Sequence, residues 1–451
     1  MSTRDWRFLY ADGEMPRRLH HSRRGKDLGL PELIAIGVGG MIGGGIFSIL
    51  GIGAQIAGAG VVAALALGGL VALFAGYSYV RLAATFPTDG ASYTYVTRGW
   101  PEHPEFGALT GWTVILGYVG TLGLYAFTFG AYGADLIGFG GNTGFRLFLS
   151  AAVLVLFLAI NLAGARVTGA AEDLVVYTKI AILGLFAVAG LIATRESAGI
   201  PRFDEGAGSV FMAGAMIFVA YEGFQLITNA VQETDDPRRN VPRGIYASIA
   251  IVTAIYVILA YVAVAALPVE KLVEAKEYAL AVVAQPVLGQ TGAILVSLAA
   301  LLATSSAINS TMFGASRMMA DMGDDRTMPE TFARRNRAQV PYAAIVALTS
   351  LGLVLTLFGS LEVIASFSSM TFLLVSLLVS FANLRLRDQT GARASIVVSG
   401  IVLMTVTIVL LWVYLALNDP ATLAFVALLY LVSLGAERSY AFWRSRNRLQ
   451  R

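Results

Sequence analysis

The stretch GVGGMIGGGIFSILGIG, residues 37–53, lies inside the first long apolar segment of the chain. Each glycine in a helix costs about 1 kcal/mol relative to alanine, so the consecutive glycines Gly43, Gly44 and Gly45 disfavour an unbroken helix. The flanking residues are apolar enough to enter a bilayer, where irregular backbone is tolerated only against protein or a water-filled cavity. We therefore expect a helix break at residues 43–45 whose free N–H groups bind an anionic group, as in transporters. The alternative is a close-packed helix pair with small residues at its interface.

The composition is that of a protein with many membrane spans. Of the 451 residues, 57% are hydrophobic and 14% are charged, and the mean hydropathy is +0.70, whereas soluble proteins contain about 25% charged residues. There is no cysteine, and His20, His21 and His103 lie in polar segments, which argues against disulfides, Cys-ligated metals and a histidine relay in the membrane. We expect no cofactor and no metal. The basic residues of the loops indicate topology rather than nucleic-acid binding.

Twelve apolar runs are long enough to cross a bilayer. They are residues 32–57, 60–86, 107–137, 145–163, 167–193, 208–230, 242–268, 290–322, 341–359, 361–386, 394–417 and 420–436. If the N-terminus is inside, 26 of the 32 Lys and Arg residues fall on inner segments and five on outer loops, as the positive-inside rule requires. We therefore expect a multi-pass protein of the plasma membrane with both termini in the cytoplasm.

The positions of the predicted breaks indicate an internal repeat. The sixth run carries Gly214 and then Tyr221-Glu222-Gly223-Phe224 in mid-span, and breaks in the first helix of each of two five-helix halves are typical of inverted-repeat transporters. Residues 277–289 are apolar but too short to cross, which predicts an extracellular re-entrant or capping helix. The expected segments are a cytoplasmic N-terminus without a cleavable signal (1–30), two repeats (31–193 and 194–388), two accessory spans (389–436) and a basic cytoplasmic tail (437–451).

Two ionisable residues lie deep within predicted spans. Lys179 is 13 residues after Arg166 and 16 before Arg195, too far from either end of the span for its ammonium to reach the membrane surface easily. On membrane-insertion scales, placing such a charged group in mid-span costs roughly 3 kcal/mol of free energy. It needs carbonyl or hydroxyl partners, or it must be able to lose its proton; the alternative is a fixed ammonium that ties two helices together. Glu222 at the sixth-run break is a candidate to be hydrated, to pair with a substrate amine or to carry a proton, and otherwise is a cavity-facing carboxylate without a transport role.

Hydroxyl and amide side chains cluster in the eighth run, where they either bond back to their own helix or form a cation site facing the first break. They are Thr304, Ser305, Ser306, Asn309, Ser310 and Thr311, and the tenth run repeats the pattern with Ser366, Ser368, Ser369 and Thr371. Phe218 and Tyr221 are candidates for aromatic lids over a binding site or for apolar core residues.

Four stretches carry a resemblance to a known family. They are GVGGMIGGGIFSILG (37–51), GYSYVRLAATFPTDGASYTYV (76–96), FVAYEGFQLITNAVQETDDPRRNVPRGI (218–245) and SSAINSTMFGASRMMADMGDDRTMPETF (305–332). In order and spacing they resemble the first, second, sixth and eighth spans, with adjoining loops, of the amino acid–polyamine–organocation (APC) superfamily. The stretch VVYTKIAILGLF (175–186) is similar to the fifth span of prokaryotic, proton-coupled, sodium-independent amino acid transporters, which places their lysine at Lys179.

The resemblance implies an all-α integral membrane protein with 12 transmembrane helices and the sodium-coupled leucine transporter fold. That fold has a 5+5 inverted repeat with broken helices 1 and 6, plus two accessory helices. The implied substrate-binding residues are Ile42, Gly43, Gly44, Gly45, Ile46, Phe218, Ala220, Tyr221, Glu222 and Gly223, with the carboxylate on the glycine N–H groups and the α-amino group on the carbonyls of 220–223.

The resemblance also implies a proton-coupling set. Lys179 would reach the Gly39 carbonyl and Ser305 or Ser306, where sodium sits in sodium-coupled relatives. Two positions depart from the family pattern. Gln225 stands where many members carry Glu, which argues against a proton or cation role for that position, and Glu222 stands where an apolar residue or Asp is common.

The expected function is proton-coupled symport of amino acids by alternating access, with the lipid bilayer as surroundings and no enzymatic activity. Lys179 would lose and regain a proton through the cycle. The alternatives are an amino acid or polyamine exchanger in which Lys179 is only structural, and a non-transporting amino acid sensor on the same fold. The substrate's identity and the oligomeric state do not follow from the sequence.

Overall fold

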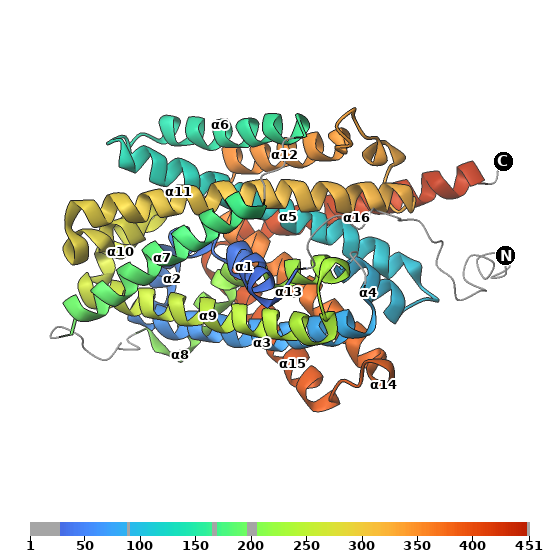
Figure 1. Cartoon of the computed structure of the whole chain (residues 1–451), viewed down its shortest axis with the longest axis horizontal. Coiled ribbons are helices and arrows are strands. Elements are labelled where there is room, and N and C mark those ends of the chain that lie inside the picture. Colours follow the sequence, from blue (N-terminus) through green and yellow to red (C-terminus); the bar gives the residue numbers. More distant parts are fainter. Residues whose placement is uncertain (1–27, 88–90, 165–168, 196–204, 449–451) are drawn as a thin grey trace.

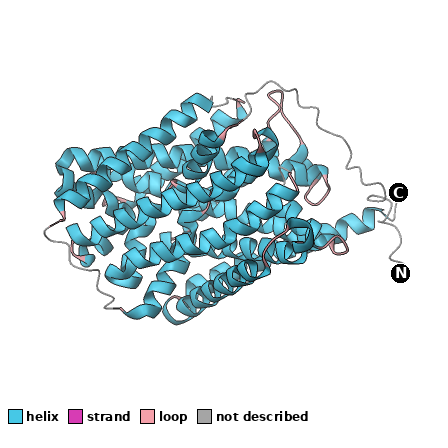
Figure 2. Ribbon diagram, turned by 60° about the horizontal axis from the view of Figure 1, so that its bottom comes forward, coloured by secondary structure: helices cyan, strands magenta, loops and turns pink. Residues whose placement is uncertain are grey.

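The computed structural model describes residues 28–87, 91–164, 169–195 and 205–448. Regular secondary structure in these ranges is helical, apart from one isolated bridge between Leu28 and Thr234. Most of the long helices run along the long axis of the molecule and pack side by side (Figures 1 and 2). The predicted N-terminal segment falls almost entirely outside the described residues.

The helices coincide with the apolar runs of the sequence. The principal ones are α1 (Leu30–Met41), α2 (Gly45–Ala57), α3 (Val61–Thr85), α5 (Pro104–Leu136), α6 (Thr143–Leu162), α7 (Gly169–Ala193), α8 (Gly206–Met216), α9 (Pro237–Ala266), α11 (Ala279–Asp324), α12 (Tyr342–Phe358), α13 (Leu361–Arg385), α15 (Ala394–Asn418) and α16 (Pro420–Arg448). Shorter ones are η2 (Gly58–Gly60), α4 (Ala91–Gly99), η3 (Ile217–Tyr221), η4 (Phe224–Glu233), α10 (Val269–Ala275), η5 (Lys276–Tyr278), η6 (Glu330–Ala333) and α14 (Arg387–Thr390).

Ten segments of the described chain are long and apolar enough to cross a membrane. This number is smaller than the twelve predicted runs for two reasons. The turn η2 joins α2 and α3 into one continuous segment, Gly45–Thr85, and α12 has only 17 residues. Twelve crossings therefore stay a prediction, while the all-helical membrane architecture is established. The last helix, α16, also continues to Arg448, well into the region expected to be a tail.

The first span is broken at the predicted glycines. Helix α1 ends at Met41 and α2 begins at Gly45, so Ile42, Gly43 and Gly44 lie outside both helices. The α1 segment starts with Pro31 in its first turn, a position where the missing N–H of proline costs nothing. The interruption leaves a helix C-terminus and a helix N-terminus facing each other within one apolar segment.

The sixth span is broken as well. The α-helix α8 gives way at Ile217 to the 3₁₀ segments η3 and η4, which are separated by Glu222 and Gly223. Runs of 3₁₀ helix this long are uncommon and often mark a functional hinge. Gly223 has φ +135°, a conformation that is open essentially to glycine alone.

The two breaks are in direct backbone contact. A Cβ atom placed on Gly40 would lie 3.2 Å from the Cα atom of Gly223, and one placed on Gly223 would overlap the backbone of Gly40 and Met41. The ends of the two spans that lie away from the breaks are tied together too, since the Leu28 N–H before α1 donates to the carbonyl of Glu233, the last residue of η4, at 2.7 Å. The first and sixth spans thus form one unit at the centre of the molecule.

The opposite end of the molecule is closed by α10 and η5 (at the left in Figure 1). Here Lys276 pairs with Glu362 at the start of α13, and Glu277 pairs with Arg146 of α6. The predicted short helix at residues 277–289 corresponds to the first part of α11, which is separated from the rest by a non-helical Gly289 with φ +70°.

The contact between the breaks predicts the effect of adding one methyl group. Gly223→Ala forces alanine into a strained conformation, at a cost of about 1–3 kcal/mol, and pushes its Cβ into the Gly40 backbone. We expect a lower melting temperature of the purified protein in detergent. The matched control is Gly314→Ala within α11, where a Cβ atom meets no atom within 4 Å. Equal melting temperatures for the two variants would contradict the close contact.

Candidate functional site

The first-span break exposes two kinds of unpaired backbone groups. The last carbonyls of α1 and the first N–H groups of α2 have no partner within their own helices. The helix dipoles make the first region attractive to cations and the second attractive to anions. All residues from Met41 to Leu50 are buried, so these groups need partners from elsewhere in the molecule or from a ligand.

Lys179 of α7 supplies donors for the carbonyl end. Its Nζ atom donates to the carbonyls of Gly39 at 2.9 Å and of Ile42 at 2.6 Å, and its side chain is fully buried. A cation at a helix C-terminus is favoured by the dipole, so this contact stabilises both the buried ammonium and the break. The predicted contact with Gly39 is present, and Ile42 is an additional partner that the sequence did not indicate.

Tyr256 of α9 connects the two breaks. Its hydroxyl lies 2.7 Å from the carbonyl oxygen of Met41 and 3.1 Å from that of Ala220. These are the carbonyls next to the interruption in the first span and in η3. A tyrosine within an apolar span carries no signature in a single sequence, so the sequence does not predict this role.

Glycine is required at 43–45 because other elements press against all three positions. A Cβ atom on Gly43 would lie 2.8 Å from the Tyr125 ring, one on Gly44 2.8 Å from the Thr128 hydroxyl, and one on Gly45 2.7 Å from the Cα atom of Ala220. Backbone, rather than side chains, therefore forms this part of the site. Thr128 also exchanges a hydrogen bond with Ser48 in the first turn of α2.

Ser369 of α13 holds the break of the sixth span. Its hydroxyl accepts from the Val219 N–H at 2.9 Å and donates to the Met216 carbonyl at 2.6 Å, the point where α8 becomes η3. The neighbouring Ser368 instead bonds back to Ile364 of its own helix at 2.7 Å. The tenth-run hydroxyl cluster of the sequence thus contains one residue that anchors the site and others that satisfy their own helix.

Glu222 is buried at the second interruption, only 6% exposed. Its carboxylate accepts a hydrogen bond from the Gln225 side chain, whose carbonyl oxygen in turn accepts from the Gly223 N–H at 3.2 Å. Gln225, singled out in the sequence as a departure from the family pattern, therefore positions the acid beside it.

The remaining predicted residues lie around these groups. Ile46 follows Gly45 in the first turn of α2, and Phe218 is fully buried in η3. Tyr221 packs edge-on against Tyr256, with ring centroids 5.4 Å apart, and its hydroxyl donates to the Leu65 carbonyl at 2.6 Å. These two contacts hold the ring between neighbouring spans, and a role of Tyr221 in binding stays a prediction.

The eighth-run cluster is placed beside the first break by α11. Ala307 lies against Gly43, within 3.0 Å of a Cβ atom placed there, and Ser305 and Ser306 precede it, both partly buried. Thr304 bonds back to the Ala300 carbonyl at 2.7 Å, as expected for a hydroxyl within a helix. The role of Ser305 and Ser306 as partners of Lys179 stays a prediction.

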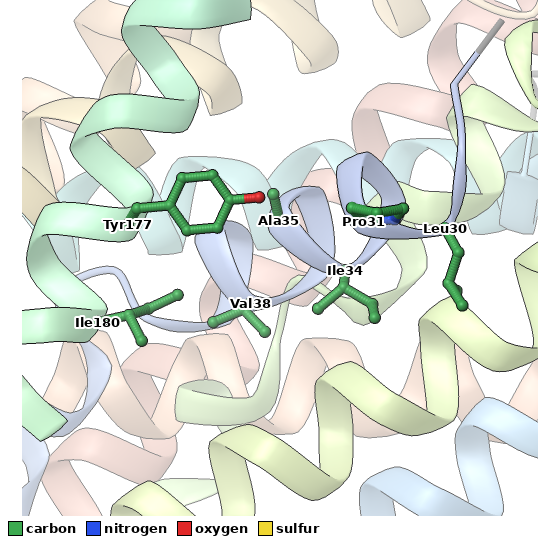
Figure 3. Close-up of a pocket in the computed structure, with 7 residues that line it drawn as sticks. All are labelled: Leu30, Pro31, Ile34, Ala35, Val38, Tyr177 and Ile180. Carbon is green, nitrogen blue, oxygen red and sulfur yellow. The ribbon is translucent and has the colours of Figure 1, made fainter.

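A groove of about 290 Å³ runs along the outer side of the first half-helix (Figure 3). It is lined by Leu30, Pro31, Ile34, Ala35 and Val38 of α1, and by Tyr177 and Ile180 of α7. Its surface is almost entirely apolar. The groove flanks α1 but does not include the residues of either break, so it is separate from the candidate site.

Comparison with known proteins agrees with this architecture. Residues 28–434 match the family model described as amino acid permease. An uncharacterized protein of Methanocaldococcus jannaschii is 36% identical over 86% of this chain and 89% of its own length. The inner membrane transport protein YbaT of Escherichia coli is 30% identical over 85% and 89%, and the branched-chain amino acid permease BcaP of Bacillus subtilis is 26% identical over 81% of each chain. The chain therefore belongs to the amino acid permease family of the APC superfamily, whose members are membrane transporters and not enzymes.

Proposed function

We propose that this permease is a secondary active transporter that moves an amino acid across the plasma membrane together with a proton. The observation that carries the proposal is the juxtaposition of two broken spans, at which buried N–H and carbonyl groups converge. An amino acid carries one anionic and one cationic group at a fixed separation. The two breaks offer one attractive region for each.

The proposed substrate orientation follows from the dipoles. The carboxylate binds the N–H groups of Gly43, Gly44 and Gly45 at the start of α2, where partial positive charge is concentrated. The α-amino group binds carbonyls of the sixth-span break, from Ala220 to Gly223. Ile42, Ile46, Phe218 and Tyr221 surround these groups. In this proposal the backbone binds the carboxylate and the amino group, which all amino acids share, and the neighbouring residues contact the side chain of the substrate.

Lys179 is the proposed coupling group, with Gly39, Ser305 and Ser306 as its partners. Its two hydrogen bonds hold the end of α1, so loss of its proton would weaken that hold and free the half-helix to move. The same two bonds also favour a second candidate function. If the ammonium is permanent, the protein is an exchanger, and Lys179 is a structural tie between α1 and α7.

The proposed architecture has twelve crossings, arranged as an inverted repeat of residues 31–193 and 194–388 with accessory spans at 389–436. Both termini would lie in the cytoplasm. The transport cycle would rock the first, second, sixth and seventh spans against the others. The contact between the two breaks supports this division, because it joins the first and sixth spans directly.

Transport by the reconstituted protein tests the coupling. In sodium-free proteoliposomes, an inward proton gradient should drive accumulation of amino acid by the wild type and not by Lys179→Ala, because the variant has no group to protonate at α1. The melting temperature of the variant and its exchange activity, measured as counterflow without a gradient, show whether it is folded. Uptake that ignores the gradient and requires internal amino acid would establish the exchanger instead.

A second prediction concerns the anchor of the sixth span. Ser369→Ala leaves the Val219 N–H and the Met216 carbonyl without their partner, and each unsatisfied buried group costs about 1–3 kcal/mol. We expect the transport efficiency to fall by roughly tenfold or more, since 1.4 kcal/mol corresponds to a factor of ten. Ser368→Ala is the matched control, because it removes only a bond within α13. Initial uptake rates over a range of substrate concentrations measure the transport efficiency of both variants. Similar losses in Ser369→Ala and Ser368→Ala would contradict a specific role of Ser369 at the break.

A further inference from the structure

We propose that a polar pocket between α6, α11 and the segment that leads into α12 binds the headgroup of an anionic phospholipid. The pocket shares no residue with the two breaks, and the inference does not depend on proton coupling or on the identity of the substrate. The lining residues that matter here are Asn161 and Gly164 at the end of α6, Ser316 and Arg317 of α11, and Ala338 and Gln339 before α12.

Asn336 holds the segment before α12 against the end of α6. Its side-chain oxygen accepts from the N–H groups of Ala338 at 2.9 Å and of Val340 at 3.0 Å, and its side-chain nitrogen donates to the Leu162 carbonyl at 2.9 Å. Gly164 has φ +74°, and a Cβ atom placed on it would lie 2.6 Å from that of Ala338. Close contacts between remote segments therefore form the pocket.

The pocket presents hydrogen-bonding side chains. The buried Asn161 donates to the side-chain oxygen of Asn309 at 2.9 Å, which ties α6 to α11, and Ser316 and Gln339 add a hydroxyl and an amide to the lining. The enclosed volume is about 30 Å³, close to the share of one water molecule in the liquid. A phosphate group would therefore bind at the mouth of the pocket, with the enclosed part large enough for one water.

Arg317 brings positive charge to the lining. Its Nη1 atom donates to the Phe313 carbonyl at 3.2 Å, and its Cζ atom lies 3.1 Å from the centre of the Phe313 ring. The guanidinium is thus folded along α11 over a ring that is exposed on the outside of the bundle. Because a guanidinium binds phosphate through two parallel N–H groups, this side chain is suited to hold a phosphate next to apolar surface.

Arginines outnumber acids among the residues that line the pocket or flank its lining in the chain. They are Arg317, Arg334, Arg335 and Arg337, of which the last three are exposed. Asp321, one turn beyond Arg317, pairs with Arg335 at 3.9 Å and so balances one of these charges. Asp324 and Asp325 come at the very end of α11, about two turns beyond Arg317. The remaining positive charge is complementary to an anionic headgroup.

Apolar surface continues from the pocket along the outer side of α12. Its exposed apolar side chains are Tyr342, Val346, Val354 and Leu357. Helices α12 and α6 lie side by side at the edge of the bundle (top of Figure 1), where exposed apolar side chains of a span contact lipid tails. A phospholipid has a charged group and apolar tails, so it matches both the mouth of the pocket and this surface. A soluble anion would match the mouth alone.

The position along the membrane agrees with this occupant. The segment between α11 and α12 lies at the end of the molecule opposite to α10 (Figure 1). In the proposed topology this end faces the cytoplasm, and clusters of arginine beside a span on that side attract anionic lipid headgroups.

Binding of phospholipid by the purified full chain tests the inference. Native mass spectrometry measures occupancy by dioleoylphosphatidylglycerol, which is anionic, and by dioleoylphosphatidylcholine, which has the same tails and no net charge. We expect tighter binding of phosphatidylglycerol by the wild type. Arg317→Gln should weaken that binding roughly fivefold, the factor that corresponds to about 1 kcal/mol for each basic residue at an anionic surface. Arg387→Gln is the matched control, because it removes an exposed arginine of α14, and should leave binding unchanged.

A second variant separates the pocket from charge alone. Ala338→Leu narrows the mouth and keeps all four arginines, so it should also weaken binding of phosphatidylglycerol; the melting temperature without added lipid shows whether each variant is folded. Unchanged binding by Ala338→Leu, or equal losses in Arg317→Gln and Arg387→Gln, would overturn the pocket as the binding site. Equal binding of both lipids by the wild type, or displacement of phosphatidylglycerol by inorganic phosphate, would overturn the anionic lipid as its occupant. Transport is not measured here, so these outcomes leave the proposed function untouched.

Discussion

The whole structure depends on backbone groups that are left unpaired within the membrane. A polar backbone group in hydrocarbon costs several kcal/mol unless it is hydrogen-bonded. The glycines of the first span and the 3₁₀ turns of the sixth create such groups in the middle of apolar segments. The rest of the fold brings partners to them from distant parts of the chain.

The partners share one property: each comes from a helix outside the broken spans and each contacts main-chain atoms. Lys179 reaches two carbonyls of the first span, Tyr256 reaches one carbonyl in each broken span, and Ser369 contacts both a donor and an acceptor in the sixth. Three different helices therefore fix the geometry of the breaks. Movement of any one of these helices relative to α1 or η3 would break its hydrogen bonds to the main chain. The geometry of the site is therefore linked to the packing of the helix bundle.

The sequence predicted the parts of this arrangement that have a local cause. The first break follows from the consecutive glycines, and the need of Lys179 for carbonyl partners follows from the cost of a charge in mid-span. Tyr256 could not be predicted, because a tyrosine in an apolar span is as common in a packed core as at a site. Ser369 could be placed in a hydroxyl cluster but not distinguished from Ser368, since their difference lies in which neighbour each faces. The roles of Tyr256 and Ser369 depend on contacts between segments that are far apart in the chain, and a single sequence does not reveal such contacts.

The hydroxyl of Tyr256 has one hydrogen and two carbonyl oxygens within reach, those of Met41 and Ala220. That one hydrogen is shared between a carbonyl of the first span and a carbonyl of the sixth. The spacing of the two broken spans at this point is therefore matched to the reach of a single hydroxyl on α9, a helix that belongs to neither of them.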